Sequence, residues 1–158
     1  MLTSRDTARK PAMRRILFVC LGNICRSPTA EAVLRAKAPH LKIDSAGTAG
    51  WHIGKPPYGP AIAAAALRNY DLSSLSARQV HSQDFQDFDL ILAMDEDNLA
   101  DLKRIQPEKA HATLRLFLDY APETGQTAVP DPYFTRDFEG ALDLIERASD
   151  GLIASLAP

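Results

Sequence analysis

The chain has 158 residues, 46% of them hydrophobic, and a formal net charge of −2. This length fits one domain with a hydrophobic core of its own. The charge balance gives no basic field that would attract a nucleic acid, and lysines and arginines are scattered apart from a short cluster between Arg5 and Arg15. We therefore expect no nucleic-acid partner.

The start of the chain is predicted to be a disordered tail over residues 1–12, because this stretch is polar and lacks periodicity; Met13 is an alternative start. The apolar run Ile16–Leu21 is shorter than the hydrophobic region of a signal peptide, and no cleavage pattern follows it. No segment has the length needed to span a membrane. The sequence predicts a cytoplasmic protein with no membrane partner.

Apolar runs and helical patterns alternate along the remainder. Short β-rich runs predict four strands, at Ile16–Val19, Leu41–Ser45, Phe88–Ala93 and Leu114–Leu118. Helical spacing or composition predicts helices from Pro28 to Lys37, Ala61 to Tyr70, Asp95 to Ile105 and Phe138 to Leu152, with long loops over Gly50–Pro60 and Tyr120–Phe134. This alternation predicts an α/β fold: a single open, mostly four-stranded parallel sheet with helices on both faces.

The segment after the first strand carries the clearest chemical signal. Cys20 is followed, after five residues, by Arg26 and Ser27, and Pro28 then suits the first turn of a helix. Inward-pointing loop amides, a helix N-terminus and a guanidinium would bind a tetrahedral oxyanion and favour Cys20 as a thiolate nucleophile. Ligands of open parallel sheets bind beyond the carboxyl ends of the strands, where Cys20 is expected. The sequence therefore predicts a phosphate-binding loop after the first strand.

Two cysteines do not make a disulfide scaffold, and in a reducing compartment they are better explained as catalytic or redox-active groups. Cys25 has two readings: it packs in the core, or it forms a reversible disulfide with Cys20. The four histidines share no ligand-like spacing with each other or with a cysteine: His40, His52, His81 and His111. We expect no metal site and no cofactor.

The run from Cys20 to Ser27, CLGNICRS, resembles the phosphate loop of the low-molecular-weight protein tyrosine phosphatases. Further landmarks follow in the family's order between Arg14 and Ala154: residues 44–47 (DSAG), Trp51, 77–79 (ARQ), 94–95 (MD) and 131–133 (DPY). The resemblance implies a phosphatase domain over residues 13–158. Such a domain would hydrolyse protein phosphotyrosine and small aryl phosphates through a cysteinyl-phosphate intermediate, without a metal.

The resemblance also assigns roles to individual residues. Cys20 is the nucleophile, Arg26 holds the phosphate and Asp131 is the general acid that later accepts a proton from water. The phosphate-binding loop comprises Leu21, Gly22, Asn23, Ile24, Cys25, Arg26 and Ser27, and the walls of the substrate pocket are Trp51, Tyr133 and Phe134.

The resemblance favours one role for each of three further loop residues, Ser27, Asn23 and Cys25. Ser27 either caps the following helix or, as the family favours, hydrogen-bonds the Cys20 sulfur. Asn23 resembles the residue that braces the loop, or is a turn residue that tolerates left-handed geometry. The resemblance favours Cys25 as a redox partner that protects Cys20.

Two positions depart from the family pattern. Relatives often have histidine at the place of Leu75, where it supports the loop asparagine, so Asn23 needs another partner; Ser45 is the candidate. Phe134 replaces a tyrosine and therefore lacks a hydroxyl that could be phosphorylated. Asp95 is expected to cap a helix or support the site rather than act as the acid.

Three alternative functions are open to a chain of this kind. A thiol-dependent arsenate reductase of the same fold needs further cysteines, and none follows Cys25. Protein-arginine phosphatases of the family tend to have threonine where this chain has Ile24. A non-catalytic phosphate-binding module or phosphocarrier does not need both Arg26 and Asp131.

As partner we expect a tyrosine-phosphorylated protein, with a bacterial tyrosine kinase as one candidate. We expect the protein itself to be a monomer or a weak dimer.

Overall fold

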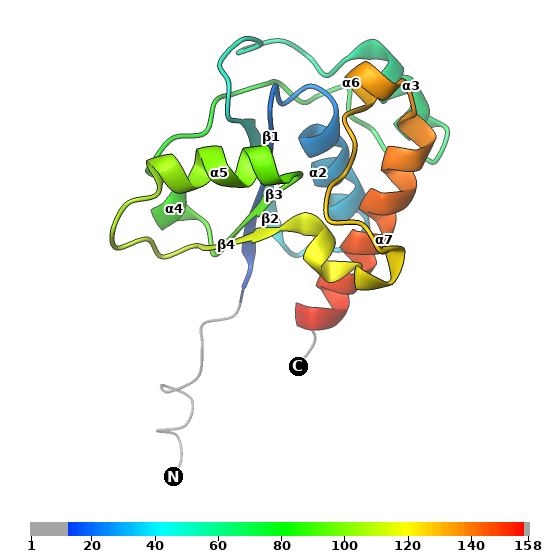
Figure 1. Cartoon of the computed structure of the whole chain (residues 1–158). Coiled ribbons are helices and arrows are strands. Elements are labelled where there is room, and N and C mark those ends of the chain that lie inside the picture. The colour runs from blue at the N-terminus through cyan, green and yellow to red at the C-terminus, as the bar shows by residue number, and fades with distance from the viewer. Residues whose placement is uncertain (1–12, 157–158) are drawn as a thin grey trace.

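A computed structural model of the protein describes residues 13–156, which form a four-stranded parallel sheet flanked by helices (Figure 1). The strands are β1 (Arg15–Cys20), β2 (Lys42–Gly47), β3 (Leu90–Ala93) and β4 (Thr113–Leu116), in the spatial order β2-β1-β3-β4. All three pairings are parallel. The predicted α/β fold with one open parallel sheet is confirmed, whereas the predicted tail over residues 1–12 lies outside the described residues.

The helices fall mostly where the sequence places them, with corrections at several boundaries. They are α2 (Arg26–Lys37), α3 (Gly59–Ala66), α4 (Asp84–Asp87), α5 (Glu96–Ile105), α6 (Pro132–Thr135) and α7 (Phe138–Leu156), with 3₁₀ turns η1 (Phe117–Tyr120) and η2 (Pro122–Thr124). The expected helix Ala61–Tyr70 ends early because the chain turns at Asn69, whose φ is 68°. The expected strand Leu114–Leu118 ends early because η1 begins at Phe117, and the expected loop Tyr120–Phe134 contains η2 and most of α6. Within residues 13–156, no helix is long and apolar enough to cross a membrane.

The side chains of β1 alternate between two hydrophobic cores. Ile16 and Phe18 pack with residues of α2 and α7, and Leu17 and Val19 pack with residues of α4 and α5. Figure 1 shows α2 and α7 on one side of the sheet and α4 and α5 on the other. Because side chains alternate along a strand, Cys20 lies on the α2 side, directly before the loop that leads into that helix.

The carboxyl end of β1 is held by main-chain contacts to the segment after β2. The amide of Thr48 donates to the Cys20 carbonyl, and that of Ala49 donates to the Leu21 carbonyl, each at 2.9 Å. A Cβ atom at Gly47 would lie 2.7 Å from the Leu21 carbonyl oxygen, so a larger residue there would displace the loop. Since β2 and β3 flank β1 on opposite sides, this edge is the point where strand order reverses and ligands of such sheets bind.

At the opposite edge, Asp89 joins the amino ends of β1, β3 and β4. Its Oδ2 accepts hydrogen bonds from the Arg14 and Arg15 amides at 3.0 Å, and its Oδ1 pairs with the Arg15 guanidinium at 2.9 Å and with His111 Nε2 at 2.8 Å. Burial opposes ionisation of Asp89, but these hydrogen bonds outweigh it and hold the pKa of Asp89 well below its usual range. The ionised carboxylate therefore stabilises the fold.

We predict that Asp89→Asn lowers the free energy of unfolding by about 2 kcal/mol at pH 7, because it replaces a charged acceptor of several partly buried hydrogen bonds. A carboxyl with a depressed pKa in the folded state stabilises the protein above its unfolded pKa of about 4, and this contribution is lost as pH falls through the folded value. The difference between the two proteins should accordingly shrink below about pH 4. Urea unfolding across this pH range measures it.

Asp150→Asn is the matched control, because it removes an exposed carboxylate that pairs with Lys37 at 3.0 Å. Exposed pairs of this kind contribute about 1 kcal/mol or less. Equal unfolding free energies of wild type and Asp89→Asn at pH 7 would contradict the role given to Asp89.

Candidate active site

The loop between β1 and α2 curls around the sulfur of Cys20, whose side chain is buried. Asn23 takes the left-handed conformation, with φ of 57°, which asparagine tolerates better than most residues. This turn directs the Asn23 amide at the sulfur, at 3.3 Å. The Ser27 hydroxyl lies 3.0 Å from the same sulfur, and α2 has no side-chain cap. Of the two roles expected for Ser27, the contact with Cys20 is the one present.

The side chain of Asn23 braces the loop from inside. Its Nδ2 donates to the hydroxyls of Ser27 at 2.8 Å and Ser45 at 2.9 Å, and its Oδ1 accepts from the Arg78 amide at 3.0 Å. The expectation that Ser45 supports Asn23 in a chain with Leu75 is confirmed. Leu75 itself packs against a separate apolar cluster.

Arg26, the first residue of α2, brings a buried positive charge beside Cys20; only 3% of its side chain is exposed. Nη1 donates to Asp95 Oδ2 at 2.7 Å and to the Val129 carbonyl at 3.0 Å, and Nη2 lies 3.4 Å from Asp131 Oδ2. Burial disfavours this charge, but Cys20 and the two carboxylates overcome it and raise the pKa of Arg26. Its Nε is buried without a hydrogen-bond partner among the described residues, so one donor is left for a ligand.

Asp95 supports Arg26 and also begins α5. Its Oδ1 accepts from the Asn98 amide at 2.8 Å as the helix N-cap, while its Oδ2 holds the guanidinium. Both oxygens are therefore occupied by donors within the protein, as expected for a supporting group.

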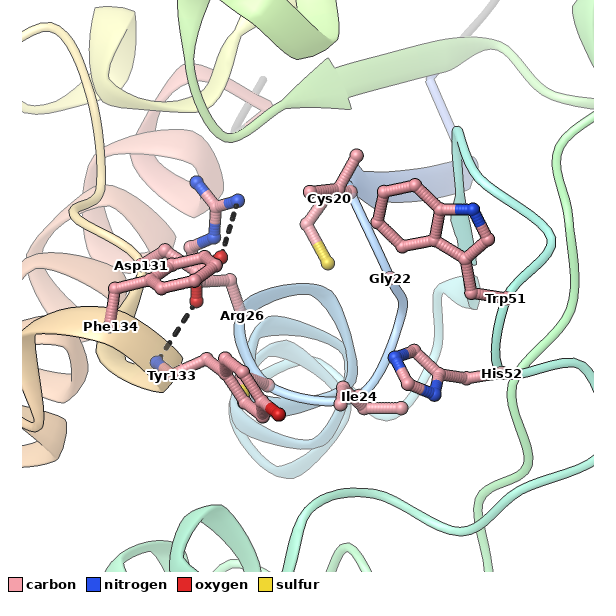
Figure 2. A pocket seen from close by; sticks show the side chains of 11 residues that line it. Cys20, Gly22, Ile24, Arg26, Trp51, His52, Asp131, Tyr133 and Phe134 are labelled. Atoms are coloured by element: carbon pink, nitrogen blue, oxygen red, sulfur yellow. Dashed lines mark hydrogen bonds and ion pairs between the residues drawn. The ribbon is translucent and has the colours of Figure 1, made fainter.

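The cavity above the loop gathers residues from three segments of the chain (Figure 2). Its lining consists of Cys20, Leu21, Gly22, Ile24, Cys25, Arg26, Trp51, His52, Asp131, Tyr133 and Phe134. Every residue predicted for the site lines it except Asn23 and Ser27, which are buried within the loop. Trp51 and Phe134 are 69% and 72% exposed, so the aromatic walls stand open toward solvent and leave room for a ring.

Asp131 lies across the cavity from Trp51, beside Arg26 (Figure 2). Its Oδ1 accepts from the Tyr133 amide at 3.1 Å, capping α6, and its side chain is 22% exposed. The longer contact with Arg26, at 3.4 Å, leaves Oδ2 more loosely held than the Asp95 oxygen on the same guanidinium. A carboxyl group in this position can exchange a proton with a molecule in the cavity.

His52 is a lining residue that the sequence reasoning missed. Its ring lies over the phosphate-binding loop, and a Cβ atom at Gly22 would come 3.0 Å from His52 Cδ2. The sequence offered one signal, its position next to the predicted wall residue Trp51.

Cys25 differs sharply from Cys20 in its surroundings. It is 5% exposed and packs against residues of α3 and Leu72. Burial, together with the negative charges of Asp131 and Cys20, raises the pKa of Cys25 to about 12. Cys25 is therefore a protonated thiol at neutral pH. Among residues 13–156, no group of three or more histidine, cysteine, aspartate or glutamate residues could hold a metal ion.

Comparison with known proteins agrees with this geometry. The family described as "Low molecular weight phosphotyrosine protein phosphatase" matches residues 15–158. A low molecular weight protein-tyrosine-phosphatase of Streptomyces coelicolor is 44% identical over 153 residues, covering 90% of this chain and 93% of the relative. The Bacillus subtilis relative YfkJ, of the same description, is 41% identical over 150 residues, covering 91% and 96%.

Solved structures of similar proteins have the same fold as this chain. The crystal structure of YfkJ from Bacillus subtilis superposes with a TM-score of 0.86 at 40% identity, covering 93% of this chain and 96% of that one. A structure titled as DARP, drosophila arginine phosphatase, reaches a TM-score of 0.84 at 28% identity, covering 91% and 98%. A structure titled as an arginine phosphatase thus shares this architecture with a relative named as a protein-tyrosine-phosphatase.

We predict that Asn23→Gly slows alkylation of Cys20 by iodoacetate at pH 6 about tenfold, corresponding to about 1.4 kcal/mol. Glycine keeps the left-handed backbone but removes the bonds that hold Ser27 and the loop around the thiolate. Asn69→Gly is the control, since Asn69 also has a left-handed φ and no side-chain hydrogen bond is found for it in the described structure. Equal alkylation rates in Asn23→Gly and wild type would contradict the bracing role.

Proposed function

The chain belongs to the low-molecular-weight phosphotyrosine protein phosphatase family, and from this premise we propose that Cys20, Arg26 and Asp131 carry the reaction. It is a protein-tyrosine-phosphatase, which hydrolyses phosphotyrosine in proteins through a cysteinyl-phosphate intermediate. The observation that carries the residue assignment is the buried Arg26 beside the Cys20 sulfur, with Asp131 on the same guanidinium.

In the first step, the Cys20 thiolate attacks phosphorus. The bond between sulfur and phosphorus forms as the bond to the tyrosine oxygen breaks, and Asp131 gives its proton to the departing oxygen. Arg26 and the amides of the loop bind the other phosphate oxygens and the charge that develops on them. The products of this step are the tyrosine side chain and phosphorylated Cys20.

In the second step, water attacks the same phosphorus atom. The Asp131 carboxylate takes a proton from this water, the bond to sulfur breaks, and Cys20 leaves as a thiolate with inorganic phosphate as product. The Ser27 hydroxyl, 3.0 Å from the sulfur, stabilises the departing thiolate. Asp131 ends protonated, ready for the next substrate.

The walls of the cavity support an aryl substrate. Trp51 and Tyr133 stand on opposite sides of the opening, with Ile24 between them at the loop (Figure 2). An apolar side chain at position 24 suits a phenyl ring better than the guanidinium of phosphoarginine. Ile24 therefore supports phosphotyrosine over phosphoarginine as the substrate. The shared fold alone does not distinguish between these two substrates.

We assign Cys25 as the redox partner of Cys20. A peroxide would convert the Cys20 thiolate to a sulfenic acid, and the Cys25 sulfur would attack it, forming a disulfide and releasing water. Both cysteines are free and line the same cavity, which supports this assignment. Because burial raises the pKa of Cys25 to about 12, its thiol must lose its proton in that step.

The biological setting is also a proposal. We propose a tyrosine-phosphorylated protein as substrate, which the names of the relatives support, with a bacterial tyrosine kinase as one candidate. A catalytic thiol works where it stays reduced, which supports a cytoplasmic location. A monomer or weak dimer remains the expectation for the assembly.

We predict that Cys20→Ser abolishes hydrolysis of p-nitrophenyl phosphate at about pH 5–6 in the presence of EDTA, while inorganic phosphate still binds. The serine hydroxyl lacks the nucleophilicity of the thiolate, but the loop amides and Arg26 remain.

Arg26→Lys should lose phosphate binding as well and lower kcat/KM by roughly a thousandfold, since an ammonium cannot make the bidentate contact. Steady-state kinetics and calorimetry measure both effects; turnover in Cys20→Ser would rule out the assignment of the nucleophile.

We predict that Asp131→Asn lowers kcat/KM for phenyl phosphate by about a hundredfold or more and that for p-nitrophenyl phosphate much less. Phenolate is a poor leaving group without a proton, whereas p-nitrophenolate departs readily without one. Asp119→Asn, which alters an exposed carboxylate paired with Arg115, should change neither rate. If Asp131→Asn affects both substrates equally, Asp131 is not the general acid.

A further inference from the structure

The segment that carries Asp131, residues 129–136 and here called the acid loop, is anchored unevenly. On the upstream side, the Val129 amide donates to the Met94 carbonyl at 2.9 Å and the Val129 carbonyl accepts from Arg26. Downstream, the backbone bonds of α6 run within the loop itself, from the amides of Phe134, Thr135 and Arg136 to the carbonyls of Asp131 and Pro132. Apart from the continuation of the chain into α7 at Phe138, contacts of side chains attach this half of the acid loop to the rest of the protein.

Tyr58, directly before α3, supplies such an attachment. Its amide donates to the Ile24 carbonyl at 2.8 Å, which fixes it to the phosphate-binding loop. Its carbonyl accepts from the Ala61 and Ile62 amides at the start of α3. The backbone of Tyr58 is thus set by the phosphate-binding loop and α3, whichever side chain it carries.

The side chain of Tyr58 reaches the acid loop at two residues. Its ring centroid lies 5.1 Å from that of Tyr133, and its hydroxyl accepts a hydrogen bond from Arg136 Nη1 at 3.1 Å. The Arg136 guanidinium also lies 5.3 Å from the ring centroids of both Tyr58 and Phe138. We call Tyr58, Tyr133 and Arg136 the clasp; it joins the two loops that must meet around the substrate.

Arg136 holds a strained backbone at this point. Its φ is 64°, a left-handed conformation that costs about 1–2 kcal/mol for a residue with a side chain. Such strain persists where surrounding contacts over-determine the conformation. Here those contacts are the stacking on two rings and the hydrogen bond to the Tyr58 hydroxyl.

We propose that Tyr58 is a positioning residue that, through the clasp, fixes Asp131 at the distance from the phosphate-binding loop required for proton transfer. The proposal rests on the assignment of Asp131 as general acid. A proton donor must come within about 3 Å of the leaving oxygen, and a displacement of about 1 Å can lower the rate about a hundredfold. Tyr58 itself does not line the cavity, so it acts through the residues it holds.

The test is the dependence of kcat/KM on the leaving group. Tyr58→Ala should lower kcat/KM for phenyl phosphate about tenfold and that for p-nitrophenyl phosphate less than about threefold, because the second substrate needs the acid less. Tyr58→Phe keeps the ring contact with Tyr133 and removes the bond to Arg136, so its effect should be smaller in the same direction. A loss of general stability or of phosphate binding would instead lower both rates together.

A double-mutant comparison separates the acid loop from the phosphate-binding loop. In the Asp131→Asn background, Tyr58→Ala should cause no further loss with phenyl phosphate, since residues that act as a unit are not additive. An undiminished tenfold loss in that background would show that Tyr58 acts elsewhere and would overturn the proposal. If Asp131→Asn shifts the ratio between substrates and Tyr58→Ala does not, the acid assignment stands and the clasp fails. If Asp131→Asn shifts nothing, both fail.

Arg136→Gly distinguishes positioning from stability. Glycine adopts the left-handed conformation freely, so the free energy of unfolding should not fall, yet the Arg136 contacts of the clasp are lost and phenyl phosphate turnover should decline at least as much as in Tyr58→Phe. Tyr120→Phe is the matched control, because Arg115 lies 4.9 Å from the Tyr120 ring centroid and 3.5 Å from its hydroxyl, away from the cavity. It should leave the ratio between the substrates unchanged; an equal shift in Tyr120→Phe would overturn the specific role of the clasp.

Discussion

The buried charge of Arg26 is the constraint around which the site is arranged. A guanidinium with 3% of its surface exposed is tolerated only with counter-charges and hydrogen-bond acceptors around it. Those partners come from three places: Cys20 at the end of β1, Asp95 after β3, and Val129 with Asp131 on the acid loop. Segments that are far apart along the chain therefore contact the same guanidinium, and this guanidinium also binds the phosphate.

The two carboxylates that contact Arg26, those of Asp95 and Asp131, differ in how firmly they are held. Asp95 is fixed at 2.7 Å, with its other oxygen capping α5, so it serves as a permanent counter-ion. Asp131 is at 3.4 Å, on a loop whose downstream half makes side-chain contacts to the rest of the protein before the chain enters α7. The site thus separates a carboxylate that neutralises the guanidinium from one that can release it and turn to the substrate. Because Asp131 has the longer contact with Arg26, the attachment of the acid loop matters for its position.

Patterns of short range in the sequence predicted most of this architecture. The buried strands follow from continuous apolar runs, and the phosphate-binding loop from the spacing of Cys20, Arg26 and Ser27. Ser45 was predictable as a partner of Asn23 because Leu75 cannot donate the hydrogen bond that a histidine gives in relatives, although the structure shows Ser45 as an acceptor and the Arg78 amide as the donor to Asn23. The contact between Tyr58 and Arg136 was not predictable, since these two residues are separated by 78 positions and only the fold brings them together. The boundaries of α3 and β4 depended on local turns with no clear signal.

The bonds around Asn23 also determine where the Ser27 proton points. Ser45 donates to the Glu31 carboxylate at 2.6 Å, so its oxygen is left to accept from Asn23. Burial raises the pKa of Glu31, and the hydrogen bonds from Ser45 and Arg35 offset this rise only in part. Because Asn23 Nδ2 also donates to Ser27, the Ser27 hydroxyl keeps its own hydrogen, for which the Cys20 sulfur at 3.0 Å is a nearer partner than the Ala46 carbonyl at 3.4 Å. A carboxylate that never meets the substrate therefore orients, through two serines and an asparagine, the hydrogen bond that stabilises the nucleophile.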